Sequence, residues 1–264
     1  MPKILHNGKA LIIGVEEING KMLDEFPDLK VIGCPMTGTE HLPWKKIKER
    51  NIKVISLKDF PIFLSTITST SEHCIGLLLA LMRNYRTALN PPYKERDFYK
   101  GHKLAQKTLL VIGRGRVGKQ VLKIADSFGM NLLSFDRYDG DGTDIYLWNL
   151  IESADVISLH IGLSGNEGFF TKEMFQKMKP TACLINTSRD RIIEKGALIW
   201  ALENKIISGA AVDFVDDLEL VEYSQTHDNL ILTNHISGNT FEDREKTENF
   251  IINIVNNYIQ DNGH

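Results

Sequence analysis

Short apolar runs alternate with amphipathic or polar stretches along the whole 264-residue chain. Near the start, three such runs are KALIIGV, DLKVIGC and NIKVISL, at residues 9–15, 28–34 and 51–57. From residue 108 onward there are six more, TLLVIG, NLLSFD, DVISLH, ACLINT, GAAVDF and LILTNH. Short apolar runs separated by helical stretches predict the buried strands of parallel sheets that helices cover on both faces. The pattern therefore predicts an α/β protein.

Two stretches predict the longer helices. EHCIGLLLALMRNYRTAL, residues 72–89, predicts one long buried helix that ends before Pro91, because proline disfavours the helical conformation of the residue before it. NTFEDREKTENFIINIVNNYI, residues 239–259, predicts a second helix with Asn239 or Thr240 as its cap and acids in its first turn. If this last helix returns to the first lobe, that lobe is discontinuous in sequence.

Composition narrows the class of protein. With 42% hydrophobic and 25% charged residues, the chain has an ordinary soluble globular composition. Basic and acidic residues are interspersed and leave a net charge of −3, which is not the electrostatic pattern of a protein that binds nucleic acid. The longest apolar stretch, HCIGLLLALM, is shorter than the roughly 20 residues of a membrane-spanning helix, and the start of the chain has no signal-cleavage pattern. We therefore expect a cytoplasmic protein whose partner is a small molecule or a second copy of itself.

The cysteines predict neither a disulfide framework nor a metal site. There are three of them, Cys34, Cys74 and Cys183, and no two form a CxxC pair. We expect buried, reduced thiols and no bound metal.

The six later runs each end in a turn-forming or chemically useful residue. These are Gly113, Asp136, His160, Asn186 with Thr187, Asp213 and His235. The carboxyl ends of parallel strands meet at one edge of the sheet, where open α/β proteins bind ligands. The sequence therefore predicts one site at this edge, long enough for a dinucleotide.

A glycine motif follows the first of these runs. Gly113, Gly115 and Gly118 form GxGxxG between a predicted strand and a predicted helix, the context in which this pattern binds a pyrophosphate. Asp136 lies 136 − 118 = 18 residues past the last glycine, near the spacing of about 20 at which an acid binds the ribose 2′-hydroxyl. This acid favours NAD over NADP. Arg137 keeps NADP open, because an arginine there can bind the 2′-phosphate.

Two side chains at the same edge suit chemistry on an organic acid. Arg189 follows the fourth later run, where its guanidinium could hold a carboxylate through two hydrogen bonds, and Arg191 is the less favoured neighbour. His235 follows the sixth, beside Gly238, and imidazole titrates near neutral pH. His160 is the rival base. The remaining histidines are expected to be structural or exposed, namely His6, His41, His73, His102, His227 and His264.

Several segments together resemble, in order and spacing, the D-isomer-specific 2-hydroxyacid dehydrogenase family, of the D-3-phosphoglycerate dehydrogenase and glyoxylate reductase type. They are KLAQKTLLVIGRGRVG, LLSFDRY, SADVISLHIGL, INTSRDRIIEKGAL, GAAVDFVDDLE and ILTNHISGNT. Upstream, DLKVIGCPMTGTEHLP and TSTSEHCIGLLLALMRN look like that family's substrate lobe and connecting helix. The resemblance covers essentially the whole chain.

The resemblance implies a doubly wound Rossmann sheet inserted in a smaller flavodoxin-like lobe that is shortened at its N-terminus. The implied domains are residues 1–88 plus 242–264 for the substrate lobe and residues 89–241 for the NAD-binding domain. It further implies a homodimer that transfers a hydride between nicotinamide and a D-2-hydroxy acid or 2-oxo acid.

The resemblance also assigns roles to residues of this chain. The implied cofactor contacts are Gly113, Gly115, Arg116, Val117, Gly118, Asp136, Ile161, Thr187, Ser188, Asp213 and Gly238. Arg189 would bind the substrate carboxylate and polarise its carbonyl, and His235 would be the acid/base. Backbone amides around Thr37 and Gly38 would hold the same carboxylate.

The chain departs from the family pattern at three positions. The glutamate that pairs with the catalytic histidine falls on Leu218, and a one-residue loop adjustment could bring in Asp217 or Glu219 instead. The usual glycine after the arginine is Asp190, and the usual proline in the third-strand region is Gly162.

The vacant glutamate position motivates an alternative function, an NAD-binding regulator with little or no turnover. A different chemistry on an NAD-bound intermediate has less support, because no other nucleophile and base are paired.

Overall fold

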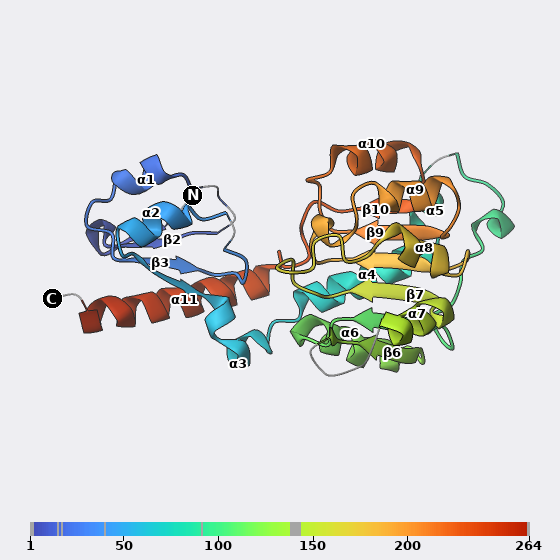
Figure 1. Cartoon of the computed structure of the whole chain (residues 1–264), viewed down its shortest axis with the longest axis horizontal. Helices are drawn as coiled ribbons and strands as arrows, with labels where there is room; N and C mark the ends of the chain where they lie inside the picture. Colours follow the sequence, from blue (N-terminus) through green and yellow to red (C-terminus); the bar gives the residue numbers. More distant parts are fainter. Residues whose placement is uncertain are drawn as a thin grey trace. The chain divides into compact units, whose positions relative to one another are not determined.

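The computed structural model describes residues 3–14, 16, 18–39, 41–90, 92–137 and 144–262, with the backbone alone at residues 144 and 145. Pro91 and His264, for which the sequence makes predictions, lie outside the described residues. The chain forms two compact units, Met1–Ile67 with Asn239–His264, and Thr68–Gly238 (Figure 1). The second unit is thus inserted in the first, as the sequence predicts.

The first unit is a four-stranded sheet between helices. Its strands, in sheet order, are β1 (Lys3–Leu5), β2 (Ala10–Ile12), β3 (Val31–Cys34) and β4 (Lys53–Ser56), with β1 antiparallel and the others parallel. Leu11 and Ile32 pack on the face that also carries side chains of the helices α1 (Gly20–Asp24) and α2 (Trp44–Glu49). The opposite face packs against α11 (Phe241–Asn262), so the predicted return of the C-terminal helix is confirmed.

The second unit is a six-stranded parallel sheet in the order β10-β9-β8-β7-β5-β6. Its strands are β5 (Thr108–Ile112), β6 (Asn131–Phe135), β7 (Val156–Leu159), β8 (Cys183–Asn186), β9 (Gly209–Val212) and β10 (Leu230–Leu232). Each lies within one of the six apolar runs. This is the predicted doubly wound arrangement, with β8 and β7 as its two middle strands and the chain order reversing at β5.

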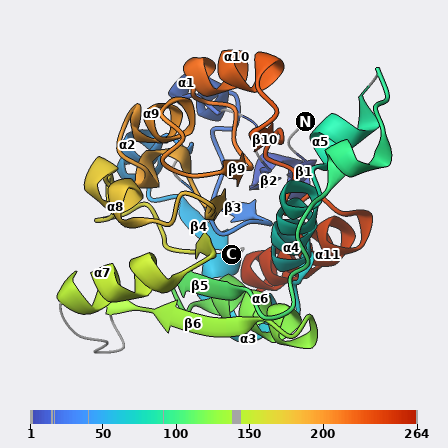
Figure 2. The ribbon, with the colours of Figure 1, turned by 90° about the vertical axis from the view of Figure 1, so that its right-hand side faces the viewer.

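Helices cover both faces of this sheet (Figure 2). One face carries α4 (Ser69–Met82) and α6 (Arg116–Ser127), and the other carries α7 (Asp144–Ser153), α8 (Lys172–Lys177) and α9 (Ala197–Glu203). Successive strand residues point to opposite faces, so Leu110 packs with α7 to α9 while Leu109 packs with α4 and α6. The strands β7, β8 and β9 are buried throughout, which is why their residues are mostly apolar.

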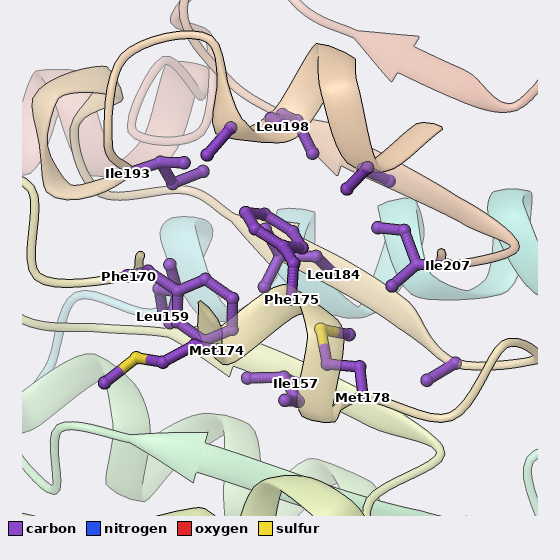
Figure 3. Close-up of a cluster of buried hydrophobic side chains, with 14 of the residues drawn as sticks. Ile157, Leu159, Phe170, Met174, Phe175, Met178, Leu184, Ile193, Leu198 and Ile207 are labelled. Atoms are coloured by element: carbon purple, nitrogen blue, oxygen red, sulfur yellow. The ribbon is translucent and has the colours of Figure 1, made fainter. Parts of the chain in front are cut away.

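The larger core lies under α8 and α9 (Figure 3). Phe170 and Phe175 are fully buried and meet edge to face, with ring centroids 4.9 Å apart. Ile157, Leu159 and Leu184 of the central strands pack around them. Burying one such side chain stabilises the fold by about 1.5–3 kcal/mol, so this cluster holds the strand ends that carry the site in place.

The prediction of a single helix over residues 72–89 is wrong in one respect, because this stretch forms two helices. α4 ends at Met82 and α5 (Tyr85–Leu89) begins after Asn84, which has φ +53°. Asparagine tolerates this left-handed conformation, and the Asn84 side chain donates to the carbonyl of Lys100. The carbonyl of Met82 accepts from the backbone N–H of His102 at 2.7 Å instead of continuing the helix.

The packing of α4 also shifts the boundary of the compact units. α4 packs against α6, β8 and β9, because Cys74, Leu78 and Met82 enter the core of the second unit. The compact second unit therefore begins at Thr68, within the segment that the sequence assigns to the first lobe. Strand β1 has no sequence prediction, and helix α10 (Leu218–Thr226) lies between the fifth and sixth of the later apolar runs, where the alternation predicts a helix. The structure also contains several short helices, α3 (Pro61–Leu64), η1 (His6–Gly8), η2 (Leu57–Asp59), η3 (Arg96–Tyr99) and η5 (Asp190–Ile192).

One stretch of the described chain, Pro61–Met82, is apolar and long enough to cross a membrane by length and composition. It comprises α3 and α4, with 44% of its apolar window buried inside the protein. Since Ile75 and Leu78 lie in the core of the second unit, packing against the sheet accounts for the apolar character of α4.

The expectation of buried free thiols is confirmed at Cys34, Cys74 and Cys183.

Candidate active site

The glycine turn joins β5 to α6. Gly113 has φ +99°, and a Cβ there would lie 2.5 Å from the carbonyl oxygen of His160. A Cβ on Gly118 would overlap the carbonyl oxygen of Gly113, whereas a Cβ on Gly115 would meet no heavy atom within 4 Å. Two glycines are therefore required by close backbone packing, and the third leaves open space at the start of α6. The N-terminus of this 12-residue helix, at Arg116, favours an anion through its outward-pointing N–H dipoles.

Other predicted cofactor residues surround the same turn. Ile161 lies over it, because the Ile161 side chain would contact a Cβ on Gly113 at 2.9 Å. Val117 faces the opposite way and packs on the core beneath α6. Asp136 follows β6, and its Oδ2 accepts from the backbone N–H of Arg114 at 2.7 Å. This bond fixes the carboxylate beside the glycine turn. Arg137 lies over the ring of Phe169, with its guanidinium 5.4 Å from the centroid.

Thr187, at the end of β8, carries an orphaned polar atom. The residue is 7% exposed, and its buried hydroxyl has no hydrogen-bond partner among the described residues. Buried polar groups are normally hydrogen-bonded, so an unpaired hydroxyl at a ligand-binding edge is typical of a group that binds a ligand. Together with the glycine turn and Asp136, this hydroxyl makes the edge a fit for a dinucleotide.

The turn that carries Arg189 is held by Asn186, which is fully buried. The Asn186 side chain accepts from the backbone N–H of Ser188 at 2.9 Å and donates to the carbonyl of Arg189 at 2.9 Å. The Ser188 hydroxyl in turn donates to the carbonyl of Leu159 at 2.9 Å. These bonds fix the backbone on both sides of Arg189. Its guanidinium donates from Nη1 to the carbonyl of Ser188, and no acid pairs with it in the described part of the chain.

Two departures from the family pattern are compatible with this geometry. Asp190 opens the short helix η5 and is absent from the residues with positive φ, so an aspartate there is unstrained. A Cβ on Gly162 would meet nothing within 4 Å, so this position accepts residues other than glycine. Arg191 pairs with Glu167 at 2.7 Å on the surface, which agrees with its being the less favoured arginine.

His235 lies in a turn three residues beyond the end of β10, where it is exposed and has φ +50°. The turn wraps around the carboxylate of Asp213, the residue that follows β9. Oδ1 of Asp213 accepts from the Thr233 hydroxyl at 2.7 Å and the Ile236 N–H at 2.9 Å, and Oδ2 accepts from the Ser237 N–H at 2.8 Å. The donors lie on both sides of His235 in sequence, so one carboxylate fixes its backbone.

The protonation state of Asp213 follows from these contacts. The residue is 1% exposed. Burial by itself raises the pKa of its carboxyl, but the hydrogen bonds from Thr233, Ile236 and Ser237 outweigh burial and hold the pKa below its ordinary value. Asp213 is therefore an anion that holds the histidine turn.

The structure shows what lies at the position where the family pattern has a glutamate and this chain does not. Leu218 is the first residue of α10 and is 73% exposed. Asp217 caps this helix, because its Oδ1 accepts from the backbone N–H of Glu219 and of Leu220. Among the described residues, no carboxylate lies within 4.0 Å of the His235 ring nitrogens, so neither Asp217 nor Glu219 replaces the partner. Within the described part of the chain, His235 therefore has no acidic partner.

His160, the rival base, belongs to a buried cluster instead. Its Nε2 is 2.8 Å from the Ser158 hydroxyl and 3.8 Å from Sγ of Cys74. Burial lowers the pKa of His160 to about 4 and raises the pKa of Cys74 to about 11. Both groups are neutral near pH 7. A histidine that resists protonation in this way is poorly suited to exchange protons with a substrate.

His160 is expected to make the protein less stable at acid pH. Its pKa in the folded state, about 4, lies below the ordinary value of 6.5, so unfolding takes up a proton between these values. Its stabilising effect is complete above pH 6.5 and is lost as the pH falls toward 4, by about 2–3 kcal/mol. Denaturant unfolding of wild type and His160→Gln from pH 7 to 4.5 measures this. The wild type should lose more stability than the variant, and parallel pH curves would refute the assignment.

Thr37 and Gly38 belong to the first unit and lie in the loop after β3. The loop is anchored on both sides, by the Leu57 N–H donating to the Met36 carbonyl and the Trp44 Nε1 donating to the Thr39 carbonyl. Thr37 is exposed. The backbone N–H groups of Thr37 and Gly38 make no hydrogen bond to the described residues, which leaves them available to an anion.

A cavity of about 610 Å³ lies beside the arginine turn in the second unit. It is lined by parts of residues 190–199 and 214–220, including Leu218, and neither Arg189 nor His235 is among its lining residues.

Gly238 follows the histidine turn, where a Cβ would meet no heavy atom within 4 Å, so packing does not require glycine. The described residues contain no group of three or more His, Cys, Asp or Glu able to hold a metal ion.

Sequence reasoning missed the residues that shape the two turns. The sequence predicts Asn186 only as a strand end and gives no role to Thr233 or Ser237. The available signal was the run of small polar residues around each candidate, INTSRD and LTNHISG, because such side chains bond to nearby backbone. Spacing alone does not show which of them turns inward.

Comparisons with known proteins support the family that the sequence motifs indicate. The NAD binding domain model of the D-isomer specific 2-hydroxyacid dehydrogenases matches residues 75–237. Glycerate dehydrogenase of Methylorubrum extorquens is 31% identical over 221 residues, which cover 80% of this chain and 68% of that protein. D-3-phosphoglycerate dehydrogenase of Bacillus subtilis is 29% identical over 256 residues, 90% of this chain but 47% of that protein. The apo-structure of D-lactate dehydrogenase from Escherichia coli has a TM-score of 0.82 at 26% identity, covering 96% of this chain and 83% of that one.

The glycine turn, Asp136 and the polar ends of adjacent parallel strands define an NAD-dependent oxidoreductase. The matched domain takes up more than half of the chain, which therefore belongs to the D-isomer specific 2-hydroxyacid dehydrogenase family. The predicted family, Rossmann fold, enzyme class and NAD cofactor are confirmed, and the regulator alternative is not favoured. The chain spans between 42% and 58% of the length of several D-3-phosphoglycerate dehydrogenases that it matches.

Proposed function

We propose that this protein reduces a 2-oxo acid to the D-2-hydroxy acid with NADH, and catalyses the reverse oxidation with NAD. The observation that carries the proposal is the pair of turns after β8 and β10, which present Arg189 and His235 with no acidic side chain of the described residues paired to either. An unpaired guanidinium suits a carboxylate ligand, and an exposed imidazole suits proton exchange with a hydroxyl.

The proposed roles follow from the chemistry of these groups. Arg189 holds the substrate carboxylate and polarises the adjacent carbonyl through its donors. His235 gives a proton to the carbonyl oxygen during reduction and takes the hydroxyl proton during oxidation. NAD, when bound, supplies the hydride acceptor or donor.

The remaining predicted contacts are proposed on the same basis. The first unit acts as the substrate lobe, with the free amides of Thr37 and Gly38 on the substrate carboxylate. The cofactor set is the one implied by the family resemblance. The buried hydroxyl of Thr187 and the open space at Gly115 support it most directly, since each is a feature that a bound dinucleotide would use.

We propose a homodimer in the cytoplasm. The segment from α5 through η3 exposes several large apolar side chains that the unit itself does not cover, Tyr85, Leu89, Tyr93 and Phe98. Exposed apolar groups gathered on one segment are typical of an interface. Sedimentation equilibrium tests the stoichiometry.

A screen of 2-oxo acids with NADH at several pH values tests the activity. The panel covers small, branched, aromatic and phosphorylated 2-oxo acids, and NADH oxidation is followed by absorbance. Stereospecific formation of a D-2-hydroxy acid supports the proposal. NADH binding by titration without oxidation of any panel member would contradict it and support a regulator.

A further inference from the structure

His73 lies on α4, a helix that contributes no predicted site residue. Its side chain is 21% exposed, and its Nε2 is 3.1 Å from the Thr233 hydroxyl and 3.7 Å from Oδ1 of Asp213. The sequence assigns it to the structural or exposed histidines. The structure instead places it against the group that holds the His235 turn.

The contacts define a direction for the hydrogen bonds. The Thr233 hydroxyl has one proton, which it donates to Oδ1 of Asp213 at 2.7 Å. The hydroxyl oxygen can then only accept from His73, so Nε2 of His73 carries a proton. The result is a chain of donors from His73 to Thr233 to Asp213. In such a chain each bond polarises and strengthens the next.

This chain ends at the turn that carries His235. Asp213 also accepts from the backbone N–H groups of Ile236 and Ser237, so its carboxylate position sets the path of the backbone through His235. Support of the turn matters because His235 has φ +50°, a left-handed conformation that is uncommon for residues other than glycine.

We infer that His73 is a positioning residue for His235 and acts through Thr233 and Asp213. This inference rests on the proposed role of His235 as the acid/base. In the related enzymes a glutamate is expected to hold the ring of the histidine, and here that position is Leu218. The structure instead supports the backbone of His235 through a buried carboxylate and a histidine on α4. An error of about 1 Å in the placement of an acid/base can cost on the order of 100-fold in rate, so backbone support of this kind affects turnover.

The kinetic test compares His73→Leu, which removes the donor, with His73→Gln, whose amide can donate to the Thr233 hydroxyl. His73→Leu should lower kcat on the order of 10-fold while the KM for the 2-oxo acid and the Kd for NADH stay within about twofold. His73→Gln should restore most of kcat. Glu72→Gln, at an exposed neighbour on the same helix, is the matched control and should keep wild-type kcat. Equal losses in His73→Leu and His73→Gln would overturn the inference.

Thr233→Val supplies a second route that leaves His73 in place. It removes the hydroxyl relay with little change in volume and should lower kcat to a similar extent. The double variant His73→Leu/Thr233→Val should be no slower than the slower single variant, because both break the same chain. Multiplied effects in the double variant would show independent roles and overturn the inference.

A readout that needs no turnover separates this inference from the proposed function. In protein labelled with ¹³C-histidine, His73→Leu should shift the ring signal of His235 and leave that of His102 unchanged. The His235 signal is assigned from the spectrum of His235→Asn. If His235→Ala kept near-normal turnover, the proposed acid/base role would fail, whatever the spectra showed. If His235→Ala were inactive but His73→Leu had wild-type kcat and an unmoved His235 signal, only the positioning role would fail.

Discussion

Replacing Arg189 by alanine is expected to lower kcat/KM for 2-oxo acid reduction by roughly 1,000-fold. The substitution removes the donors that would hold the substrate carboxylate and stabilise charge on the carbonyl oxygen, and one such donor is typically worth about 100- to 1,000-fold. NADH binding should persist, because the glycine turn and Asp136 are unaffected. Steady-state kinetics and an NADH fluorescence titration measure the two effects.

Two arginine variants sharpen this test. Arg191→Ala is the matched control, since Arg191 is two residues away and pairs with Glu167 on the surface. It should keep near-wild-type kinetics. Arg189→Lys keeps the charge but loses the planar fork, and should recover only part of the lost activity. Near-normal kcat/KM in Arg189→Ala would rule out the role assigned to this side chain.

Replacing His235 by alanine is expected to lower kcat by roughly 100- to 10,000-fold, the range that general acid/base catalysis contributes. The backbone turn should survive, because Asp213 holds it through Thr233, Ile236 and Ser237 rather than through the imidazole. NADH affinity should therefore change little. Rates with the preferred 2-oxo acid, followed across pH, measure the loss and show whether an ionisation disappears with the ring.

His102→Ala is a suitable control for this variant, because His102 lies at the amino edge of the sheet, near the end of α4. It should leave turnover unchanged. A His235→Ala enzyme that retained wild-type kcat would place the acid/base elsewhere. His160 would be a poor replacement because burial holds its pKa at about 4.

The sequence predicted the sheet of the second unit almost completely. Each of its strands lies within one of the six apolar runs, because a strand buried on both faces must be apolar throughout. The insertion of this unit in the first was also predictable, from the apolar face of residues 239–259. Hydrophobic periodicity did not show the break between α4 and α5. The break depends on Asn84 and on residues 100–102, which are distant in sequence.

The candidate site divides in the same way. Residue type and position along the chain were enough to predict Gly113, Asp136, Arg189 and His235 as site residues. The roles of Asp213 and Asp217 required coordinates, since both are acids in one short segment and only their bonds distinguish them. Asp213 turns inward to hold the histidine turn, while Asp217 caps α10.

The sequence by itself determined the α/β class, the dinucleotide edge and the family, because parallel sheets impose apolar runs and bring strand ends to one side. The tertiary structure alone decided which polar groups support the turns of Arg189 and His235. Those supports, Asn186 for one and Asp213 with His73 for the other, act through hydrogen bonds of 2.7 to 3.1 Å, which lie within one turn for Asn186 and join segments distant in sequence for Asp213 and His73. Hydrogen bonds of this length depend on how the elements pack, and no pattern in the linear sequence records that distance.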